Sequence, residues 1–244
     1  MPSHYELHDR IRGSESVDQA LGILAENVSA IGVERFIAGF VRGSPRRVDG
    51  RWRHYHYRAF NFPDGWDQEW KDFNANCPYY HACFDGQMAF DWKKVREQSD
   101  LTALEVDAWH YLADYGLIQG YTVPVHAPNH FGFLTVLGDS EDRRWCEKVE
   151  RQSEKLLYLT HAFHEAMRQR FPAFVEASDD VTLSDREVEC LRWAAAGKTS
   201  DEVASILGIS HETVRVYFKR AMRKVGANTR TQAVAIAYEM RLFS

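Results

Sequence analysis

Cysteine is scarce in this chain and shows none of the spacings that bind metal. The four cysteines form no CxxC pair, and the eleven histidines show no HExxH or comparable arrangement. Structural and catalytic metal sites depend on such ligand spacings. We therefore expect no metal site and no other cofactor.

The sequence also lacks long apolar runs. No stretch approaches the roughly 18 apolar residues that span a bilayer. The opening segment, MPSHYELHDRIRG, has no apolar core of the kind that marks a secretory signal. We expect a protein without a membrane segment that stays in the cytosol, where disulfides are rare.

The chain has enough length and apolar content for two folded domains. It holds 244 residues, of which 45% are hydrophobic and 13% aromatic. We predict a first domain over residues 1–170, a second over 183–244, and a linker over 171–182, where a proline, small residues and acids follow no helical period. The net charge of -5 excludes no nucleic-acid function, because binding depends on where charges lie.

Residues 1–170 mix helical and strand patterns. The segment 16–32 places Val17, Leu21, Leu24 and Val28 on one helical stripe, begins at Ser16 and ends at Gly32. Strands are predicted over 35–43, 52–60, 121–127 and 131–138, the last two joined by a turn at Pro128 and Asn129, and further helices over 101–116 and 140–170. The order indicates an α+β fold, an antiparallel sheet with helices on its faces.

Residues 183–244 read as short helices with clear ends. Ser184 and Glu187 form a capping-box pattern, and the next helix has Thr199 or Ser200 as its cap and Gly208 as its stop. Only a short turn then separates it from a third helix. Two short helices joined in this way are typical of a helix-turn-helix.

The third helix, over 211–225, has two unlike faces. At about 100° per residue, one face is apolar, with Val214, Tyr217, Phe218, Ala221 and Val225. The opposite face holds Glu212, Arg215, Lys219 and Arg223, with Val216 and Arg220 beside them. A charged helix face is often only solvated. Here two capped helices precede it at the spacing of a helix-turn-helix, which favours a helix that enters the major groove of DNA.

The cations of this region fall into two predicted classes. We expect Arg215 and Lys219 to reach base edges in the groove. Contacts to phosphates are expected from Lys198, Arg220, Arg223 and Lys224, and Thr213 near the start of the same helix completes the predicted DNA-binding set. A last helix, with Ala233, Ile236, Ala237 and Met240 on one stripe, packs the domain, pairs it with a second copy, or does both.

The string LSDREVECLRWAAAGKTSDEVASILGISHETVRVYFKRAMRKVGANTRTQAVA resembles the four-helix DNA-binding domain of LuxR-type transcription regulators. Glu187, Leu191 and Gly197 stand where that family keeps its most typical residues. The first half is similar to the autoinducer-binding domains of quorum-sensing receptors. This resemblance implies an α-β-α sandwich that holds an N-acyl homoserine lactone between sheet and helices. We hypothesise that a small molecule buried in the first domain stabilises a homodimer, which presents two helix-turn-helix units to a roughly palindromic promoter site.

The pocket pattern of that family is carried by Trp66, Pro78, Trp92 and Gly120, with fourteen residues from Pro78 to Trp92. The resemblance implies that Trp66 donates its indole N–H to the lactone carbonyl and that Trp92 packs on the ring. It also implies that the hydroxyls of two threonines face the pocket. These are Thr122 and Thr135.

The chain departs from the family at three pocket positions. Cys77 stands where an aspartate accepts the ligand's amide N–H, and Phe62 and Trp70 stand where the family has tyrosines. A thiol is a weak partner for an amide. A replacement acceptor is predicted from Asp72, Asn74 or Asn76, and further donors, or simple core filling, from Tyr55, Tyr57, Tyr79 and Tyr80, of which Tyr79 is included among the ligand contacts.

Three functions remain open on the sequence. The first is a regulator controlled by a lactone or a non-lactone ligand. The second is an enzyme with Cys77 or Cys83 as nucleophile and His81 nearby, although no orienting third group is visible. The third is a ligand-independent DNA-binding or partner-binding protein whose first domain has a filled core and serves only for dimerisation. If Phe62, Trp66, Trp70 and Tyr79 close on one another, no space remains for a ligand. A cavity of a few hundred Å³ would favour the first.

Overall fold

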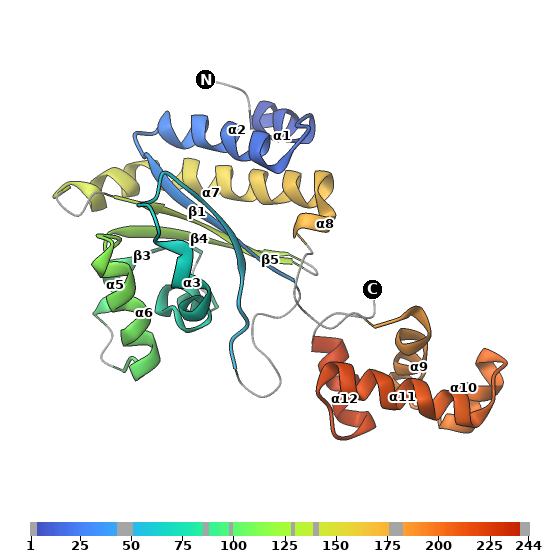
Figure 1. The fold of residues 1–244 in the computed structure, drawn as a ribbon. Coiled ribbons are helices and arrows are strands. Elements are labelled where there is room, and N and C mark those ends of the chain that lie inside the picture. Colours follow the sequence, from blue (N-terminus) through green and yellow to red (C-terminus); the bar gives the residue numbers. More distant parts are fainter. Residues whose placement is uncertain are drawn as a thin grey trace. The chain divides into compact units, whose positions relative to one another are not determined.

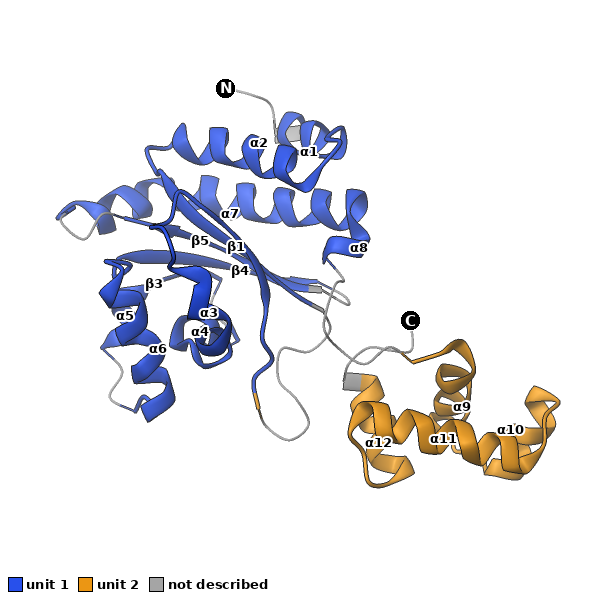
Figure 2. Cartoon of the chain, viewed as in Figure 1, with its two compact units in different colours: residues 1–41, 52–177 blue, residues 42–51, 178–244 orange. Residues whose placement is uncertain are grey.

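The structure, a computed structural model, describes residues 4–42, 51–84, 88–97, 100–127, 130–138, 142–175 and 183–239. It divides into two compact units (Figure 2). Unit 1 comprises residues 1–41 and 52–177, and unit 2 comprises 42–51 and 178–244. Each unit is described by itself.

Unit 1 is built on a sheet with the strand order β2-β1-β5-β4-β3. The pairs β1·β2, β3·β4 and β4·β5 are antiparallel, and β4 and β5 form the predicted hairpin, whose turn residues lie outside the described ranges. The strands are β1 (Arg35–Arg42), β2 (His56–Phe60), β3 (Phe90–Asp91), β4 (Gly120–Ala127) and β5 (His130–Leu137).

Long helices cover one face of the sheet (Figure 1). They are α1 (His4–Arg12), α2 (Val17–Ser29) and α7 (Trp145–Arg170), followed by the short α8 (Pro172–Val175). The hydroxyl oxygen of Ser16 caps α2 by accepting a hydrogen bond from the Gln19 N–H. Of the apolar stripe predicted for α2, Leu21, Leu24 and Val28 are buried with this face of the sheet, and Val17 is half-buried against them.

Short helices cover the opposite face (Figure 1). They are α3 (Asp67–Phe73), the 3-10 turn η1 (Asn74–Asn76), α4 (Pro78–Ala82), α5 (Trp92–Arg96) and the longer α6 (Ala103–Asp114). A capping box between Thr102 and Glu105 begins α6. These helices come from the part of the chain that carries the predicted pocket residues.

Strand alternation separates two cores. Successive side chains of a strand point to opposite faces. In β5, Leu134 and Val136 pack with the long helices, whereas Phe133 and Leu137 pack with the short ones. The same strand therefore supplies both the structural core and the face toward the short helices.

Unit 2 contains α9 (Asp185–Ala195), α10 (Ser200–Leu207), α11 (His211–Val225) and α12 (Arg230–Glu239). The Ser184–Glu187 capping box is present, and Thr199 rather than Ser200 caps α10. Gly208 ends α10 with a φ of 66°, a left-handed conformation that glycine adopts without strain. The predicted helix-turn-helix is confirmed, with Ser210 as the cap of α11.

The α+β fold and the helical second unit are confirmed, but details differ from the sequence prediction. The strand predicted over 52–60 begins only at His56, and Trp52 lies before it, with its ring stacked on that of His81 and the ring centroids 4.2 Å apart. Helix α1 was missed, although Leu7 and Ile11, four residues apart, are both buried. The helix predicted over 140–170 begins at Trp145, and Ser140 lies outside the described residues.

The predicted domain boundaries remain predictions. Phe171 and helix α8 lie within the segment 171–182 that we assign to the linker, and residues 176–182 lie outside the described residues. Among the described helices, none combines the length and the apolar content that crossing a membrane requires.

Candidate functional site

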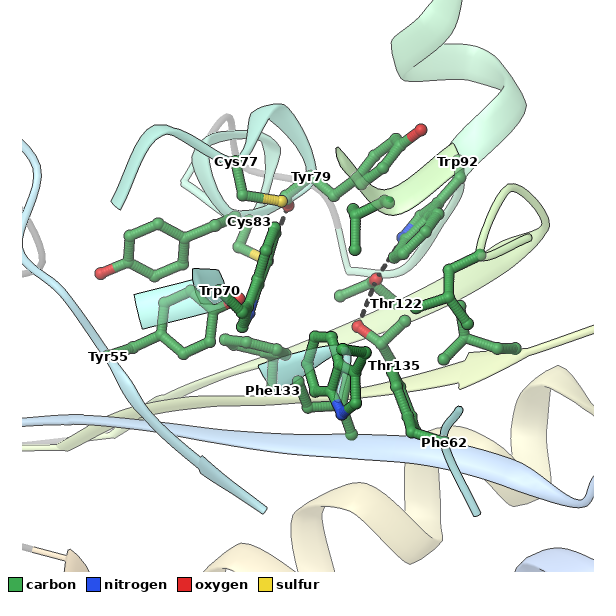
Figure 3. A pocket seen from close by; sticks show the side chains of 16 residues that line it. Tyr55, Phe62, Trp70, Cys77, Tyr79, Cys83, Trp92, Thr122, Phe133 and Thr135 are labelled. Carbon is green, nitrogen blue, oxygen red and sulfur yellow. Dashed lines mark hydrogen bonds between the residues drawn. The ribbon is translucent and has the colours of Figure 1, made fainter. Parts of the chain in front are cut away.

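A cavity lies between the sheet and the short helices of unit 1 (Figure 3). We call it the aromatic cavity. Its volume is about 30 Å³, enough for a water molecule or so. Its sixteen lining residues are Ile37, Tyr55, Phe62, Trp66, Trp70, Cys77, Tyr79, Tyr80, Cys83, Trp92, Leu112, Leu117, Thr122, Phe133, Thr135 and Leu137.

All eight residues predicted as ligand contacts line this cavity: Phe62, Trp66, Trp70, Cys77, Tyr79, Trp92, Thr122 and Thr135. Their role as contacts stays a prediction. The sequence analysis missed Phe133 and Leu137, although strand alternation places both on the same face as Thr135. It also missed Cys83 and the aliphatic residues, for which no local pattern distinguishes cavity wall from ordinary core.

Trp92 is held on the wall by a glycine and a stacked tyrosine. A Cβ added at Gly120 would lie 2.4 Å from the Trp92 ring, so only glycine leaves room for the indole there. On its other side the ring stacks on Tyr79 with centroids 3.7 Å apart and an interplanar angle of 6°. Asp91 caps α5 and so fixes the start of the helix that carries Trp92.

A buried polar relay crosses the cavity wall from Trp92 to the hairpin. The Trp92 indole N–H donates to Thr122 Oγ1 at 2.9 Å, and the hydroxyls of Thr122 and Thr135 are 2.8 Å apart (Figure 3). The two threonines face each other because they are paired in the register of β4 and β5. The relay therefore places two uncharged hydroxyl groups at the cavity wall.

The aromatic rings on the α3 side pack closely on one another. Phe62 and Trp66 have centroids 4.4 Å apart, and Trp66 and Trp70 lie 5.7 Å apart. With a volume of about 30 Å³, the cavity is far below the few hundred Å³ of a typical ligand site. Side chains must move before a ligand of ordinary size can enter.

None of the residues predicted to replace the missing carboxylate lines the cavity. Asn74 uses its amide elsewhere: its Oδ1 lies 2.7 Å from His54 Nδ1, and its Nδ2 donates to the Tyr55 carbonyl. The side chain of Asp72 is exposed, and Asn76 is not among the lining residues. The cavity wall therefore has no acidic or amide side chain.

The cysteines and the histidine of the enzyme hypothesis are engaged in other contacts. His81 has Nδ1 2.7 Å from Glu105 and Nε2 2.8 Å from the Ala75 carbonyl. The Cys83 thiol donates to the Tyr79 carbonyl at 3.3 Å. Burial raises the pKa of the Cys77 thiol to about 12, which opposes formation of a nucleophilic thiolate.

Gly120→Ala tests the Trp92 position. The added methyl displaces the indole, so we expect unit 1 to lose about 1 to 3 kcal/mol of unfolding free energy. Gly22→Ala in α2 is the matched control, because its Cβ meets no atom within 4 Å. There the helix propensity of alanine leaves stability unchanged or raised by up to about 1 kcal/mol. Urea denaturation monitored by tryptophan fluorescence measures both; equal midpoints would contradict the account.

The second candidate site is the exposed face of α11 in unit 2. Val214, Phe218, Ala221 and Val225 are buried, as predicted, and Tyr217 is half-buried. The opposite face is exposed, with Arg215, Lys219, Arg220 and Arg223. Arg215 makes only a surface contact to Glu212 at 3.3 Å, its side chain being 64% exposed. Such a contact is weak and leaves the guanidinium available to a partner.

The remaining predicted DNA contacts are partly engaged within the domain. Lys198 pairs with Glu202 at 3.1 Å, and Lys224 pairs with the buried Glu187 at 2.7 Å. The Thr213 hydroxyl lies 2.8 Å from Ser210 Oγ, the cap of α11.

Helix α12 packs on the rest of unit 2. Arg230, which the sequence analysis did not single out, places its guanidinium 4.3 Å from the centroid of the Phe218 ring. Ala233, Ile236 and Ala237 are buried within the unit, so packing accounts for them; Met240 lies outside the described residues.

A helix-turn-helix with a three-residue turn and a cationic second helix defines a class of DNA-binding proteins. Comparisons with known proteins agree. Residues 16–167 match the family described as autoinducer binding domain, and residues 181–237 match that described as bacterial regulatory proteins, luxR family. The chain therefore belongs to the LuxR-type bacterial transcription regulators that carry an autoinducer-binding domain.

Individual proteins resemble the chain over most of its length. The transcriptional activator AhyR of Aeromonas hydrophila is 30% identical, over 71% of this chain and 68% of that protein. The quorum sensing-dependent regulator RpaR of Rhodopseudomonas palustris is 26% identical, over 92% of this chain and 89% of that protein. The crystal structure of Escherichia coli SdiA has a TM-score of 0.69 at 23% identity. The match covers 99% of this chain and 98% of that chain, and it supports the fold.

Proposed function

We propose that this regulator acts in the cytosol as a homodimer that binds a roughly palindromic promoter site, with unit 1 responding to a small neutral signal. In this proposal α11 lies in the major groove. Arg215 and Lys219 contact base edges, and Arg220 and Arg223 contact phosphates. Lys198, Lys224 and Thr213 lie on the same domain and would adjust how closely that domain approaches the phosphate backbone of the DNA.

The observation that carries this proposal is the division of α11 into two faces. Its apolar side chains are buried in unit 2. On the opposite face Arg215, Lys219, Arg220 and Arg223 are exposed, and Arg215 makes only a surface contact to Glu212. The chain as a whole has a net charge of -5, so the cations do not reflect an overall basic composition. A local cationic face on the second helix of a helix-turn-helix supports binding to a polyanion.

The ligand side of the proposal rests on the aromatic cavity. Ligand binding to the folded state stabilises it by an amount that grows with the logarithm of the ratio of ligand concentration to Kd. An N-acyl homoserine lactone is the signal that the family resemblance suggests, and a related non-lactone ligand fits the neutral wall equally well. In either case the wall aromatics must move to admit it.

A second candidate function is favoured by the volume of the cavity. At about 30 Å³, the aromatic cavity is nearly filled by its own side chains. A regulator with this packing would fold, pair and bind DNA without any ligand. Both candidate functions include DNA binding, and they differ only in whether a ligand controls it.

In vitro selection tests the proposed function. Full-length protein is incubated with a library of random duplexes, bound duplexes are sequenced, and the mass of the complex is measured by light scattering. We expect enrichment of an inverted repeat whose half-sites are about 10 base pairs apart, bound by two chains. Absence of any enriched sequence would overturn the proposal, and enrichment of a single half-site bound by one chain would overturn the dimer.

Ligand control is tested on protein purified from a host that makes no acyl lactone. If a ligand controls the protein, extraction from the native source yields a bound small molecule, and its addition raises the melting temperature and the operator affinity together. If the ligand-free protein is equally stable and binds the operator equally well, the second candidate function holds.

A further inference from the structure

Residues 61–66 separate the aromatic cavity from solvent. This segment, which we call the lid segment, connects β2 to α3. Its Phe62 and Trp66 line the cavity, and Trp66 is only 4% exposed (Figure 3). Asn61 and Asp64 of the same segment are exposed. A single layer of chain therefore lies between the cavity and water at this point.

Few main-chain hydrogen bonds hold the lid segment. Among the described residues, the Trp66 N–H donates to the Pro63 carbonyl at 3.4 Å, and the side-chain amide of Asn61 donates to the Glu34 carbonyl at 3.3 Å. Most of the other lining residues lie on strands of the sheet or on helices α3 to α6, where main-chain hydrogen bonds hold the backbone. The lid segment is therefore the part of the wall that can move at the lowest cost.

The lid segment contains two residues with left-handed backbone conformations. Asn61 has a φ of 59°, the one positive φ of a non-glycine residue in the described part of the chain, and Gly65 has a φ of 77°. Asparagine and glycine enter and leave this conformation at lower cost than other residues. Pro63 lies between them and has a fixed φ, which keeps the intervening backbone stiff. Asn61 and Gly65 can thus act as hinges.

Two tyrosines at the end of α6 hold the second hinge. The Tyr111 hydroxyl donates to the Trp66 carbonyl at 2.5 Å, and the Tyr115 hydroxyl donates to the Gly65 carbonyl at 3.4 Å. The Tyr111 ring also stacks on the Phe73 ring, with centroids 4.8 Å apart. A carbonyl oxygen held by a hydrogen bond cannot turn freely with the ψ of its residue. These hydrogen bonds therefore oppose rotation at Gly65.

We propose that the lid segment opens and closes the aromatic cavity and that Tyr111 and Tyr115 are positioning residues that keep it closed. Turning the segment about its two hinges carries Phe62 out of the wall and frees the Trp66 ring, which packs on it with centroids 4.4 Å apart. This adds space to a cavity of only about 30 Å³. Admission of a ligand through the opening rests on the ligand-controlled form of the proposed function, whereas the opening itself belongs to unit 1 alone.

The four free cysteines provide a test that needs no ligand. Cys77 and Cys83 line the cavity and are at most 3% exposed. Cys146 is exposed, and Cys190 is buried in unit 2. Full-length protein without ligand is treated with N-ethylmaleimide, and the labelling of each cysteine is followed by peptide mass spectrometry. Cys146 then gives the rate of an accessible thiol, and Cys190 gives the rate of opening in unit 2.

Tyr111→Phe combined with Tyr115→Phe removes both hydroxyls and keeps both rings. We expect labelling of Cys77 to become about 10- to 100-fold faster, because the loss of two hydrogen bonds shifts an opening equilibrium by about that factor. Gly65→Ala should accelerate it by about 5- to 30-fold, since alanine is strained at a φ of 77° until the hinge turns. The added Cβ meets only one flexible side chain. The rate at Cys190 should stay unchanged.

Gly32→Ala is the matched control. Gly32 also has a left-handed φ, of 80°, but it follows α2 among the long helices, where its Cβ would approach only the end of the Lys148 side chain. This variant strains unit 1 to a similar degree without touching the lid segment, so labelling of Cys77 should stay unchanged. Equal acceleration in Gly32→Ala and the lid variants would mean that the cavity opens only when unit 1 unfolds. That result, or no acceleration in either lid variant, would overturn the inference.

Operator binding by the same preparations separates this inference from the proposed function. If the operator is bound while the lid variants are labelled no faster than the wild type, the lid is wrong and DNA binding stands. If the lid variants are labelled faster and the operator is not bound, the proposed function fails and the lid stands.

Discussion

Replacing both Arg215 and Lys219 with alanine should lower operator affinity by roughly two to four orders of magnitude. Each side chain that reads a base contributes about 1 to 3 kcal/mol, and the two lie one helical turn apart on the exposed face of α11. Fluorescence anisotropy with the selected operator measures the loss. The fold should persist, because both side chains are exposed and removing them leaves the apolar face intact.

Two matched variants show which kind of contact is lost. Arg223→Ala, at a predicted phosphate contact, should weaken operator and random duplex alike and reduce the slope of log affinity against log salt by about 0.9. Arg186→Ala removes one positive charge, as Arg223→Ala does, but from α9, where the side chain pairs with Glu189 on the surface. It should change DNA affinity little. An Arg186→Ala effect as large as that of the double variant would mean that charge alone, and not α11, determines binding.

Glu187→Ala should destabilise unit 2 by about 3 kcal/mol. Glu187 is 2% exposed, accepts a hydrogen bond from the Ser184 N–H at 2.7 Å, and pairs with Lys224 at 2.7 Å. The variant removes a helix cap and one partner of a largely buried ion pair, and the second of these alone often costs 3 to 5 kcal/mol. Lys224 keeps contact with water, which places the expected cost at the lower end. Urea denaturation followed by circular dichroism measures it.

The same contact predicts a loss of stability in acid. Burial acts to raise the pKa of Glu187, but the hydrogen bonds from Lys224 and Ser184 outweigh it, so the pKa lies below its ordinary value of 4.5. A lowered pKa contributes stability that is complete above 4.5 and is lost as the pH falls through the folded-state value. The urea midpoint of unit 2 should fall in that range, and less steeply in Glu187→Gln. A parallel fall in both proteins would exclude Glu187 as the cause.

Glu202 provides an internal comparison for that titration. Hydrogen bonds from the Thr199 N–H and from Lys198 lower its pKa to about 2. Its side chain is on the surface, where ion pairs contribute little. Glu202→Gln should therefore leave most of the acid-dependent loss in place.

The helix-turn-helix could be predicted from the sequence because its determinants are local. Ser184, Thr199 and Ser210 cap helices within three residues of themselves, and Gly208 ends a helix by its own backbone conformation. The burial of Val214 and Phe218 follows from helical periodicity alone. None of these features depends on a distant part of the chain.

Only part of the cavity lining could be predicted from the sequence. Family resemblance brought Trp66, Trp92 and Thr135 together, but these residues lie on separate elements that meet through tertiary packing. The volume depends on side-chain positions, such as the Phe62–Trp66 contact, that no local pattern determines. The short helices between Asp67 and Arg96 were missed for the same reason, since helices of five to seven residues have little intrinsic stability.

Methylation interference on the selected operator tests most directly whether α11 lies in the major groove. Methylation at guanine N7 blocks an acceptor that lies in that groove. We predict that N7 methylation at matching positions of the two half-sites prevents binding of the wild-type protein, and that one of these positions loses its effect with Arg215→Ala. A wild-type protein that binds regardless of N7 methylation, or an identical pattern for wild type and variant, would contradict the assignment of Arg215 as a base-reading residue of α11.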